Sequence, residues 1–283
     1  MGIVAAYAVP HPPLIVPTVG RGDERAIQDT VDAYQQVARE IVALDPDLIV
    51  VTSPHAPYFR DAFHITTEPE LYGDMARFGA LKTRVEATCD VEFAEGLVAR
   101  LGQAGIPAVD SARYSEPMDH ATFVGLYFVL EAFKKASASD EVRKSAHVPC
   151  PIERVGLSML SFETHRQVGR IIAELADESG KRVVFLASGD LSHKLKEDGP
   201  YGFAPEGPVF DAKIGEIFSS GNLEGLFEFD PAFADAAAEC GLRSFQIMAG
   251  AIEGRGFASE LLSLEGPFGV GYGVAAFRDA AND

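Results

Sequence analysis

Three histidines in this chain each follow a short apolar run at a distance of a few residues. The runs and their histidines are residues 3–9 with His11, residues 48–52 with His55, and residues 183–187 with His193. Each run is rich in β-branched residues, which is the pattern of a buried strand. Because ligands of open α/β sheets bind beyond the carboxyl ends of the strands, we expect the three imidazoles to meet in one pocket. Imidazole binds divalent metals and exchanges protons near neutral pH, so the pattern predicts a metal site or a proton-transfer site.

Prolines surround the first two of these histidines. His11 lies in the sequence Pro-His-Pro-Pro, and His55 lies in Ser-Pro-His-Ala-Pro. Proline fixes φ, so each loop holds its imidazole stiffly. Either loop taken alone is equally a rigid turn with a surface histidine. Two such loops after the first two strands of one β-α-β unit are expected to be neighbours, and a metal bound there would need a third ligand, often a carboxylate.

The third histidine ends the segment Ser-Gly-Asp-Leu-Ser-His at residues 188–193. Gly189 allows a sharp turn after the strand, and Asp190 and Ser192 are placed to orient His193 through hydrogen bonds. The alternative is a turn with a capping aspartate and an exposed histidine. A serine hydrolase is disfavoured because the chain has no Gly-x-Ser-x-Gly elbow.

Two further motifs carry chemically useful side chains. Asp119-His120 begins a predicted helix, where Asp119 fits an N-cap and the positive helix end disfavours a protonated His120. Such a histidine is a neutral donor or acceptor near a reacting oxygen. In Glu239-Cys240, the carboxylate is either solvent-facing or coordinating, and the thiol is either a small core group or a soft ligand. The other histidines, for which we expect structural or solvated roles, are His64, His147 and His165.

The elements that must position these residues follow from the hydrophobic periodicity. A helix over residues 24–44 between the first two strands predicts a β-α-β opening and a parallel strand pair. Further strands are predicted for residues 152–160, 183–187, 257–263 and 269–277, and further helices for residues 91–103, 121–135 and 164–179, with short helices up to residue 254. The Gly- and Pro-rich loop 194–208 is long enough to cover a site.

We predict one α/β domain over residues 1–283, with a central, mostly parallel or mixed sheet flanked by helices. The polar segment 136–151 reads as a surface excursion and is the one candidate for a boundary between two lobes. Histidine segments lie on both sides of it, so we favour two halves that share one sheet. The metal site is expected at the rim formed by the carboxyl ends of the strands.

Composition excludes several classes of protein. The chain has 24 basic and 42 acidic side chains and a formal charge of -18, so it should repel the phosphates of nucleic acids. Three scattered cysteines without a CxxC pair indicate neither a disulfide framework nor a thiolate zinc site. No basic region precedes the first apolar residues, and no run of about 18 apolar residues occurs. We therefore expect no signal peptide, no membrane span and a cytoplasmic location.

The ordered set of motifs resembles a known family. The set comprises His11 in its Pro-rich loop, Ser-Pro-His55, Asp-His120, Ser-Gly-Asp-Leu-Ser-His193 and Glu-Cys-Gly241. It is similar to the LigB-type catalytic subunits of class III extradiol ring-cleaving dioxygenases, over nearly the whole chain. The resemblance is greatest to the bacterial branch found beside, or fused to, proteins of the AmmeMemoRadiSam group, which is related to Memo.

The resemblance implies roles for individual residues. His11 and His55 match the two histidine ligands of a mononuclear non-haem Fe(II), and Glu239 matches the carboxylate that completes the facial triad. His193 matches the acid/base histidine, and His120 matches a second histidine near the substrate. The implied substrates are O2 and a catechol-like or aminophenol-like aromatic, as in the catabolism of aromatic compounds. Family members commonly assemble, so a dimer or larger homo-oligomer is expected.

One part of the resemblance points to a different function. Memo proteins have a cysteine followed by glycine at the third-ligand position, as Cys240-Gly241 stands here, and Asp190 is also Memo-like. The third ligand is therefore either Glu239 or Cys240. A thiolate would shift the metal preference toward zinc or copper. The alternative to a dioxygenase is a Memo-like metal-binding protein with a binding or redox role. A third hypothesis, for which the sequence offers less support, is a metal-dependent hydrolase that uses His193.

Overall fold

The computed structural model of the protein describes residues 1–279 and contains one eight-stranded sheet. Its strands, in spatial order, are β6 (Ala108–Asp110), β3 (Phe63–Ile65), β7 (Ile152–Gly156), β2 (Leu48–Ser53), β8 (Arg182–Ser188), β1 (Gly2–Val9), β10 (Tyr272–Arg278) and β9 (Ala258–Glu265). The central strands β7, β2, β8 and β1 are parallel, whereas β10 and β9 are antiparallel to their neighbours. The predicted α/β fold with a mixed sheet is confirmed.

The predicted pairing of the first two strands is wrong in detail. β1 and β2 do not pair with each other, because β8 lies between them and pairs in parallel with both. Their ends therefore still reach the same rim, but with the end of β8 between them. The position of β8 between β2 and β1 depends on contacts between residues far apart in the chain, which hydrophobic periodicity does not encode.

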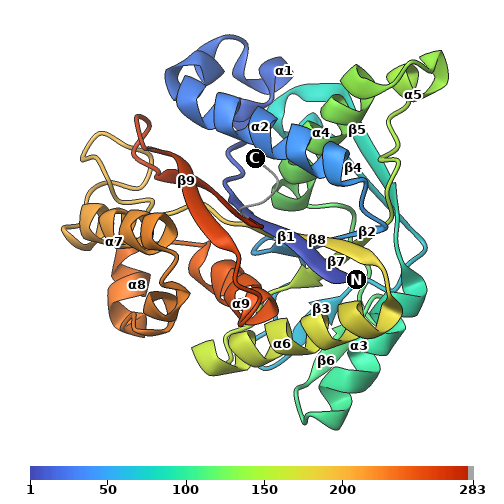
Figure 1. The fold of residues 1–283 in the computed structure, drawn as a ribbon. Helices are drawn as coiled ribbons and strands as arrows, with labels where there is room; N and C mark the ends of the chain where they lie inside the picture. The colour runs from blue at the N-terminus through green and yellow to red at the C-terminus, as the bar shows by residue number, and fades with distance from the viewer. Residues whose placement is uncertain (280–283) are drawn as a thin grey trace.

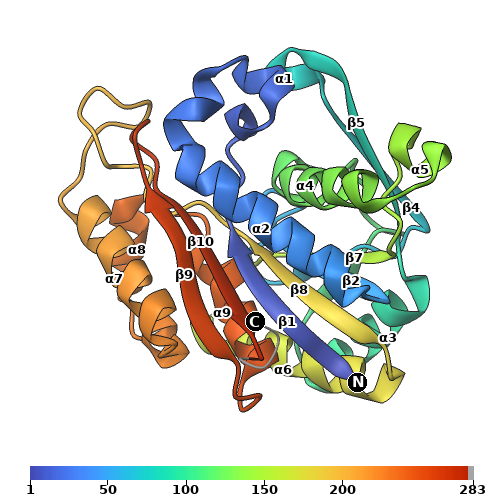
Figure 2. The same ribbon diagram turned by 45° about the horizontal axis from the view of Figure 1, so that its top comes forward.

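Helices cover both faces of the sheet (Figures 1 and 2). One face carries α2 (Gln28–Leu44) and α4 (His120–Ala136), together with the two-stranded hairpin β4 (Glu70–Met75) and β5 (Ala80–Thr88). The other face carries α3 (Val91–Gln103), α6 (Phe162–Ser179) and α9 (Leu242–Ile252). Beside β9 lie α7 (Glu206–Ser220) and α8 (Pro231–Ala237). The short helices are α1 (Pro17–Gly20), α5 (Asp140–Lys144), η1 (Pro13–Ile15), η2 (Asp23–Ile27), η3 (Ala76–Phe78) and η4 (Leu223–Phe227).

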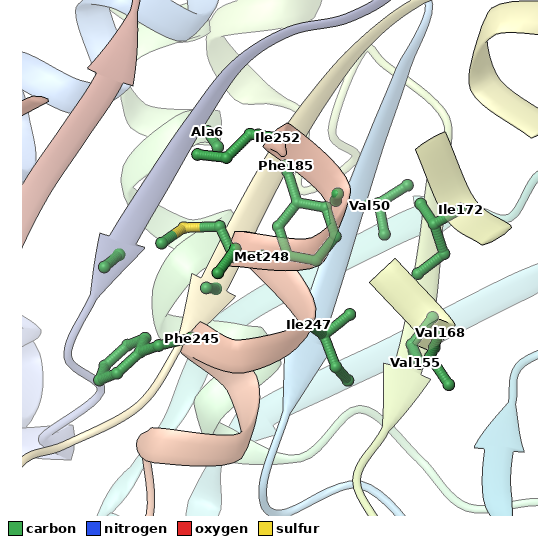
Figure 3. Close-up of a cluster of buried hydrophobic side chains, with 14 of the residues drawn as sticks. Ala6, Val50, Val155, Val168, Ile172, Phe185, Phe245, Ile247, Met248 and Ile252 are labelled. Carbon is green, nitrogen blue, oxygen red and sulfur yellow. The ribbon is translucent and has the colours of Figure 1, made fainter. Parts of the chain in front are cut away.

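A buried apolar cluster fixes α9 against the sheet (Figure 3). Phe245, Met248 and Ile252 recur at helical spacing and belong to the same buried cluster as Phe185 of β8. Truncating a buried phenylalanine such as Phe185 to alanine costs about 3–5 kcal/mol, since a cavity is left behind. The packing also fixes where α9 begins, and hence where the residues just before it lie.

The backbones of α6 and α9 touch through glycines. A Cβ added to Gly169 would lie 2.0 Å from the carbonyl oxygen of Ile247, and one added to Gly250 would lie 2.1 Å from that of Arg166. Only glycine permits so close an approach of two helices. The position of α9 is therefore set by backbone contact as well as by its apolar side chains.

Several element boundaries differ from the prediction. The predicted strand 152–160 ends at Gly156, and Ser161 then caps α6 by accepting a hydrogen bond from the Thr164 N–H. The predicted helix 24–44 is divided into η2 and α2. The hairpin β4–β5 lies where no element was predicted, since its outer face is polar and exposed. Of the helices within residues 1–279, none combines the length and the apolarity that a bilayer crossing requires.

Candidate metal centre

Three histidines come together beyond the sheet. The donor nitrogens of His11, His55 and His120 all lie within 4.8 Å of one another. The ring centroids of His55 and His120 are 4.2 Å apart, and those of His11 and His55 are 4.9 Å apart. His11 follows β1, His55 follows β2, and His120 begins α4. Two predicted ligands thus meet, and His120, which was expected near the substrate, joins them.

Hydrogen bonds select the tautomer of His11. Its Nδ1 lies 3.0 Å from Ser188 Oγ, and Ser188 Oγ donates to the carbonyl oxygen of Ala121 at 3.0 Å. The single hydroxyl proton is used in that second bond, so Ser188 Oγ accepts a hydrogen bond from the Nδ1–H of His11. Nε2 of the buried His11 is then unprotonated and carries a lone pair, which is the arrangement that a metal-binding histidine needs.

His55 lies in an exposed turn that is tied to the same network. Its backbone N–H donates to Ser53 Oγ at 3.2 Å, and Ser53 Oγ donates to Asp119 Oδ1 at 2.6 Å. The serine just after β2 therefore connects the His55 loop to the start of α4. His55 and His120 are held in position by one shared group, the Asp119 carboxylate.

The start of α4 rests on a buried ion pair. Asp119 Oδ1 accepts from the N–H groups of Ala121 and Thr122, both at 3.0 Å, which confirms the predicted N-cap. The fully buried Arg154 places Nη1 3.5 Å from Asp119 Oδ2. Sequence reasoning missed Arg154, although a cation inside an apolar strand run was a usable signal. Arg154 balances the charge that caps the helix carrying His120.

The three imidazoles are neutral at neutral pH. Burial lowers the pKa of His11 well below its usual value, and the neighbouring histidines lower it further. Desolvation, followed by the charge of His55, lowers the pKa of His120 to about 4. Desolvation also lowers the pKa of His55, against the opposing effect of Asp119. Neutral imidazoles are the form that coordinates metals, so no proton has to leave these rings before binding.

Asp190 supports His11 rather than His193. Its Oδ1 accepts from the backbone N–H of His11 at 2.7 Å, and Oδ2 lies 3.9 Å from His11 Nε2. Burial raises the pKa of Asp190 to about 7. The predicted orientation of His193 by Asp190 and Ser192 is therefore wrong: the contact that orients His193 comes from the Leu191 backbone.

His193 is set up to accept a proton. Its Nδ1 lies 3.1 Å from the carbonyl oxygen of Leu191, which can only accept, so Nδ1 carries the proton and Nε2 is unprotonated. Desolvation lowers the pKa of this half-buried ring. The carbonyl groups of Leu191 and Ala238 oppose this lowering of the pKa, and the charge of His55 adds to it. Tyr201 of the loop 194–208 lies edge-on to His193, with centroids 5.0 Å apart.

The two candidates for a further ligand point in different directions. Cys240 Sγ lies 3.6 Å from His11 Nε2. Glu239 Oε2 instead accepts from the backbone N–H of Leu242 at 2.6 Å, at the start of α9. Burial raises the pKa of Glu239 to about 7 and that of Cys240 well above its usual range. Within residues 1–279, neither belongs to the compact group of three histidine nitrogens.

A small pocket adjoins the histidines. Its volume is about 220 Å³, and it is lined by Pro54, Tyr58, Leu157, Glu239, Cys240 and Arg243. Phe78 of the hairpin turn lies 5.6 Å from His120, measured between ring centroids. Sequence reasoning missed Phe78, Tyr58 and Arg243, which no local motif distinguishes. A larger hollow of about 730 Å³ between α2 and α4 contains none of the histidines.

The remaining histidines have structural contacts. His64 Nε2 donates to the carbonyl oxygen of Tyr114 at 2.9 Å, and His165 Nδ1 lies 2.9 Å from the carbonyl oxygen of Ser161. His147 Nε2 lies 3.1 Å from Thr88 Oγ1 at the edge of the hairpin. These contacts agree with the structural roles expected for them.

Known proteins resemble this chain along its length. The family described as the catalytic LigB subunit of aromatic ring-opening dioxygenase matches residues 5–275. Protein CA_C1420 of Clostridium acetobutylicum is 33% identical over 100% of this chain and 59% of its own length. A 2,3-dihydroxyphenylpropionate/2,3-dihydroxicinnamic acid 1,2-dioxygenase of Pseudomonas putida is 29% identical over 66% of this chain and 56% of its own length. The chain thus spans little more than half of these relatives.

A solved structure has the same fold. The crystal structure of uncharacterized protein JW3007 from Escherichia coli K12 aligns with a TM-score of 0.62 at 16% identity. The alignment covers 96% of this chain and 99% of the other. At that identity the likeness concerns the fold alone.

Proposed function

This chain belongs to the family of the catalytic LigB subunit of aromatic ring-opening dioxygenases, and from that membership we propose that it is a non-haem Fe(II)-dependent extradiol dioxygenase. Its proposed substrates are O2 and a catechol-like or aminophenol-like aromatic. The observation that carries the proposal is the cluster of three neutral histidines beyond the strand ends. His193, whose Nδ1 lies 3.1 Å from the Leu191 carbonyl oxygen, follows the end of β8 between β1 and β2. Relatives named for 2,3-dihydroxyphenylpropionate, itself a catechol, support the same reaction class.

The residues present fit a metal ion. His11 presents Nε2, because Ser188 and Ala121 hold its other nitrogen, and the His55 and His120 nitrogens lie within 4.8 Å. We propose His11 and His55 as two ligands, with Glu239 completing a 2-His-1-carboxylate set. Such a set suits Fe(II) and leaves positions free for substrate.

Each side chain then has a separate task. A bound Fe(II) supplies a Lewis acid that lowers the pKa of a phenol and brings both reactants together. His193 Nε2 accepts the phenolic proton and returns it as an acid later in the reaction. His120, uncharged at the start of α4, offers a neutral hydrogen-bonding group to the substrate. Phe78 beside His120 and Tyr201 beside His193 provide aromatic rings against which a substrate ring can pack.

Turnover under controlled iron loading tests this function. The protein is loaded anaerobically with Fe(II), mixed with O2 and a panel of catechols and aminophenols, and monitored for a coloured ring-fission product. His193→Gln should retain iron and lose about 100-fold or more in kcat, since general acid–base catalysis contributes roughly 10²–10⁴-fold. His147→Gln, at the distant hairpin, is the matched control and should turn over normally. Full iron occupancy without product from any member of the panel would contradict the proposal.

One observation favours a second candidate, the Memo-like metal-binding protein. Cys240 Sγ lies 3.6 Å from His11 Nε2, whereas Glu239 is bonded to the start of α9. A thiolate ligand selects zinc or copper and would serve a binding or redox role without ring cleavage. Metal titrations of Glu239→Ala and Cys240→Ala separate the two functions. The dioxygenase predicts that Glu239→Ala weakens metal binding, and the Memo-like protein predicts that Cys240→Ala weakens it.

A further inference from the structure

Arg243 is a cation without an ionic partner. The chain has 42 acidic side chains for 24 basic ones, yet within residues 1–279 the Arg243 guanidinium forms no ion pair or hydrogen bond. Its Nε is buried and unpaired. The guanidinium makes a cation–π contact with the ring of Phe162, whose centroid lies 5.3 Å from the guanidinium carbon. A half-buried guanidinium with unused donors costs free energy unless something else satisfies it.

Arg243 lines the pocket beside the histidines. That pocket of about 220 Å³ also contains Cys240, whose Sγ is 3.6 Å from His11 Nε2, and Pro54, which precedes His55. Pockets that enclose a whole drug-sized ligand measure roughly 300–1,000 Å³. This pocket is therefore large enough for the side group of an aromatic substrate whose ring lies over the histidines.

The charge in the pocket favours an anion. Arg243 lies in the first turn of α9, at the positive end of an 11-residue helix, where a cation is disfavoured without a counter-charge. The Arg243 charge acts on the Glu239 carboxyl in the same pocket, but Glu239 turns Oε2 to the Leu242 N–H and forms no ion pair with Arg243. Tyr58 adds a phenol group on the same wall. Guanidinium binds carboxylates through paired hydrogen bonds, which these unused donors can supply.

We propose that Arg243 anchors an anionic side group, in the first place a carboxylate, of the aromatic substrate, and so determines which substrates the site accepts. The proposal rests on the proposed ring-cleaving function for the identity of the reacting ring. It does not depend on which residue completes the metal site. Arg243 acts here as a specificity-determining residue and not as an acid or base.

The test compares a carboxylate with its neutral amide. A catechol with a propionate side chain and the same catechol with a propanamide side chain are cleaved by the Fe(II)-loaded protein. The wild type should prefer the acid by about 10- to 100-fold in kcat/KM, the range expected for a charged hydrogen bond. Arg243→Gln should remove most of this preference through KM, and Arg243→Lys, which keeps the charge but not the paired geometry, should keep part of it.

Arg77 provides the matched control. It is an exposed arginine in the hairpin turn that does not line the pocket, and its charge also acts on His120. Arg77→Gln should leave the preference for the acid intact. An unchanged acid-to-amide ratio in Arg243→Gln, or its loss in Arg77→Gln, would overturn the proposal. Thermal melting of each variant shows whether loss of the Phe162 contact alone has disturbed the fold.

A binding measurement separates this proposal from the proposed function. Calorimetry with 3-phenylpropionate and 3-phenylpropanamide, neither of which has a diol to cleave, reports on the pocket alone. Acid-selective binding that is lost in Arg243→Gln supports the anchor even if no catechol is ever cleaved. Equal binding of acid and amide by the wild type would contradict the proposed role of Arg243, even if ring cleavage is observed.

Discussion

The two sides of the candidate site are built differently. On the sheet side, His11 lies at the end of β1 and is held by Ser188 at the end of β8 and by Asp190 just after it. On the helix side, Glu239 and Cys240 stand just before α9, and the left-handed Ala238 precedes them. Both orienting contacts of His11 are satisfied hydrogen bonds, whereas Glu239 is bonded away from the histidines. The sheet side is therefore preorganised, and under the proposals above the helix side determines which ligand and which substrate are bound.

Removal of a sheet-side histidine should have the largest effect. His11→Ala deletes the imidazole whose Nε2 is already directed and deprotonated, so metal content after Fe(II) or Zn(II) loading should fall to background. Glu239→Ala should retain part of the metal, because the histidine cluster is intact. Elemental analysis of the purified variants measures both. Equal metal content in wild type and His11→Ala would show that the cluster is not the metal site.

The supporting hydrogen bond is expected to matter next. Ser188→Ala removes the acceptor for His11 Nδ1–H, and loss of such a supporting contact typically costs about 10- to 100-fold in metal affinity. Ser263→Ala is the control, since Ser263 Oγ is also buried but has no partner to lose. Competition with a chromophoric chelator gives both affinities. If the two serine variants behave alike, the sheet side is not preorganised by Ser188.

The pH dependence of metal affinity distinguishes the helix-side ligands. Protons compete with the metal only below the pKa of each ligand, and the lowered histidine pKa values, about 4 for His120, weaken that competition near neutral pH. With Glu239 as a ligand, whose pKa is about 7, affinity should rise about tenfold per pH unit up to pH 7 and then level off. With Cys240, whose pKa burial raises, it should keep rising to pH 8. We expect the Glu239 pattern for Fe(II); affinity that keeps rising with pH would assign the ligand to Cys240.

The smallest predicted effect concerns the stability of α9. If the contact from Glu239 to the Leu242 N–H serves chiefly as a helix cap, Glu239→Ala should cost about 0.5–2 kcal/mol in the free energy of unfolding of the metal-free protein. Glu239→Gln keeps an acceptor at the same position and should recover most of that loss. Urea denaturation of the metal-free variants measures both. Equal stability of all three proteins would mean that the bond to α9 contributes nothing, which leaves Glu239 free to turn toward the histidines.

Much of the architecture was predictable because local patterns determine it. The β-branched runs ending in histidines became β1, β2 and β8, and Asp119 capped α4 as expected. The hairpin β4–β5 was missed because it lies outside the main sheet and exposes alternate residues. Phe78 was missed for the same reason, because its position near His120 depends on how the hairpin packs near the start of α4. One domain over residues 1–283 stays a prediction, which a single cooperative thermal transition would support.

The sequence by itself determined which side chains would follow the strand ends, since strand length and β-branched composition are local properties. It therefore identified His11, His55 and His193 and the rim where they lie. Only the tertiary structure decided that β8 separates β1 from β2, and that Ser188 consequently bonds His11. The packing of α9 on α6 likewise decided that Cys240 faces His11 and that Arg243 lines a pocket without an ionic partner. These outcomes depend on contacts between residues far apart in the chain, which no local pattern specifies.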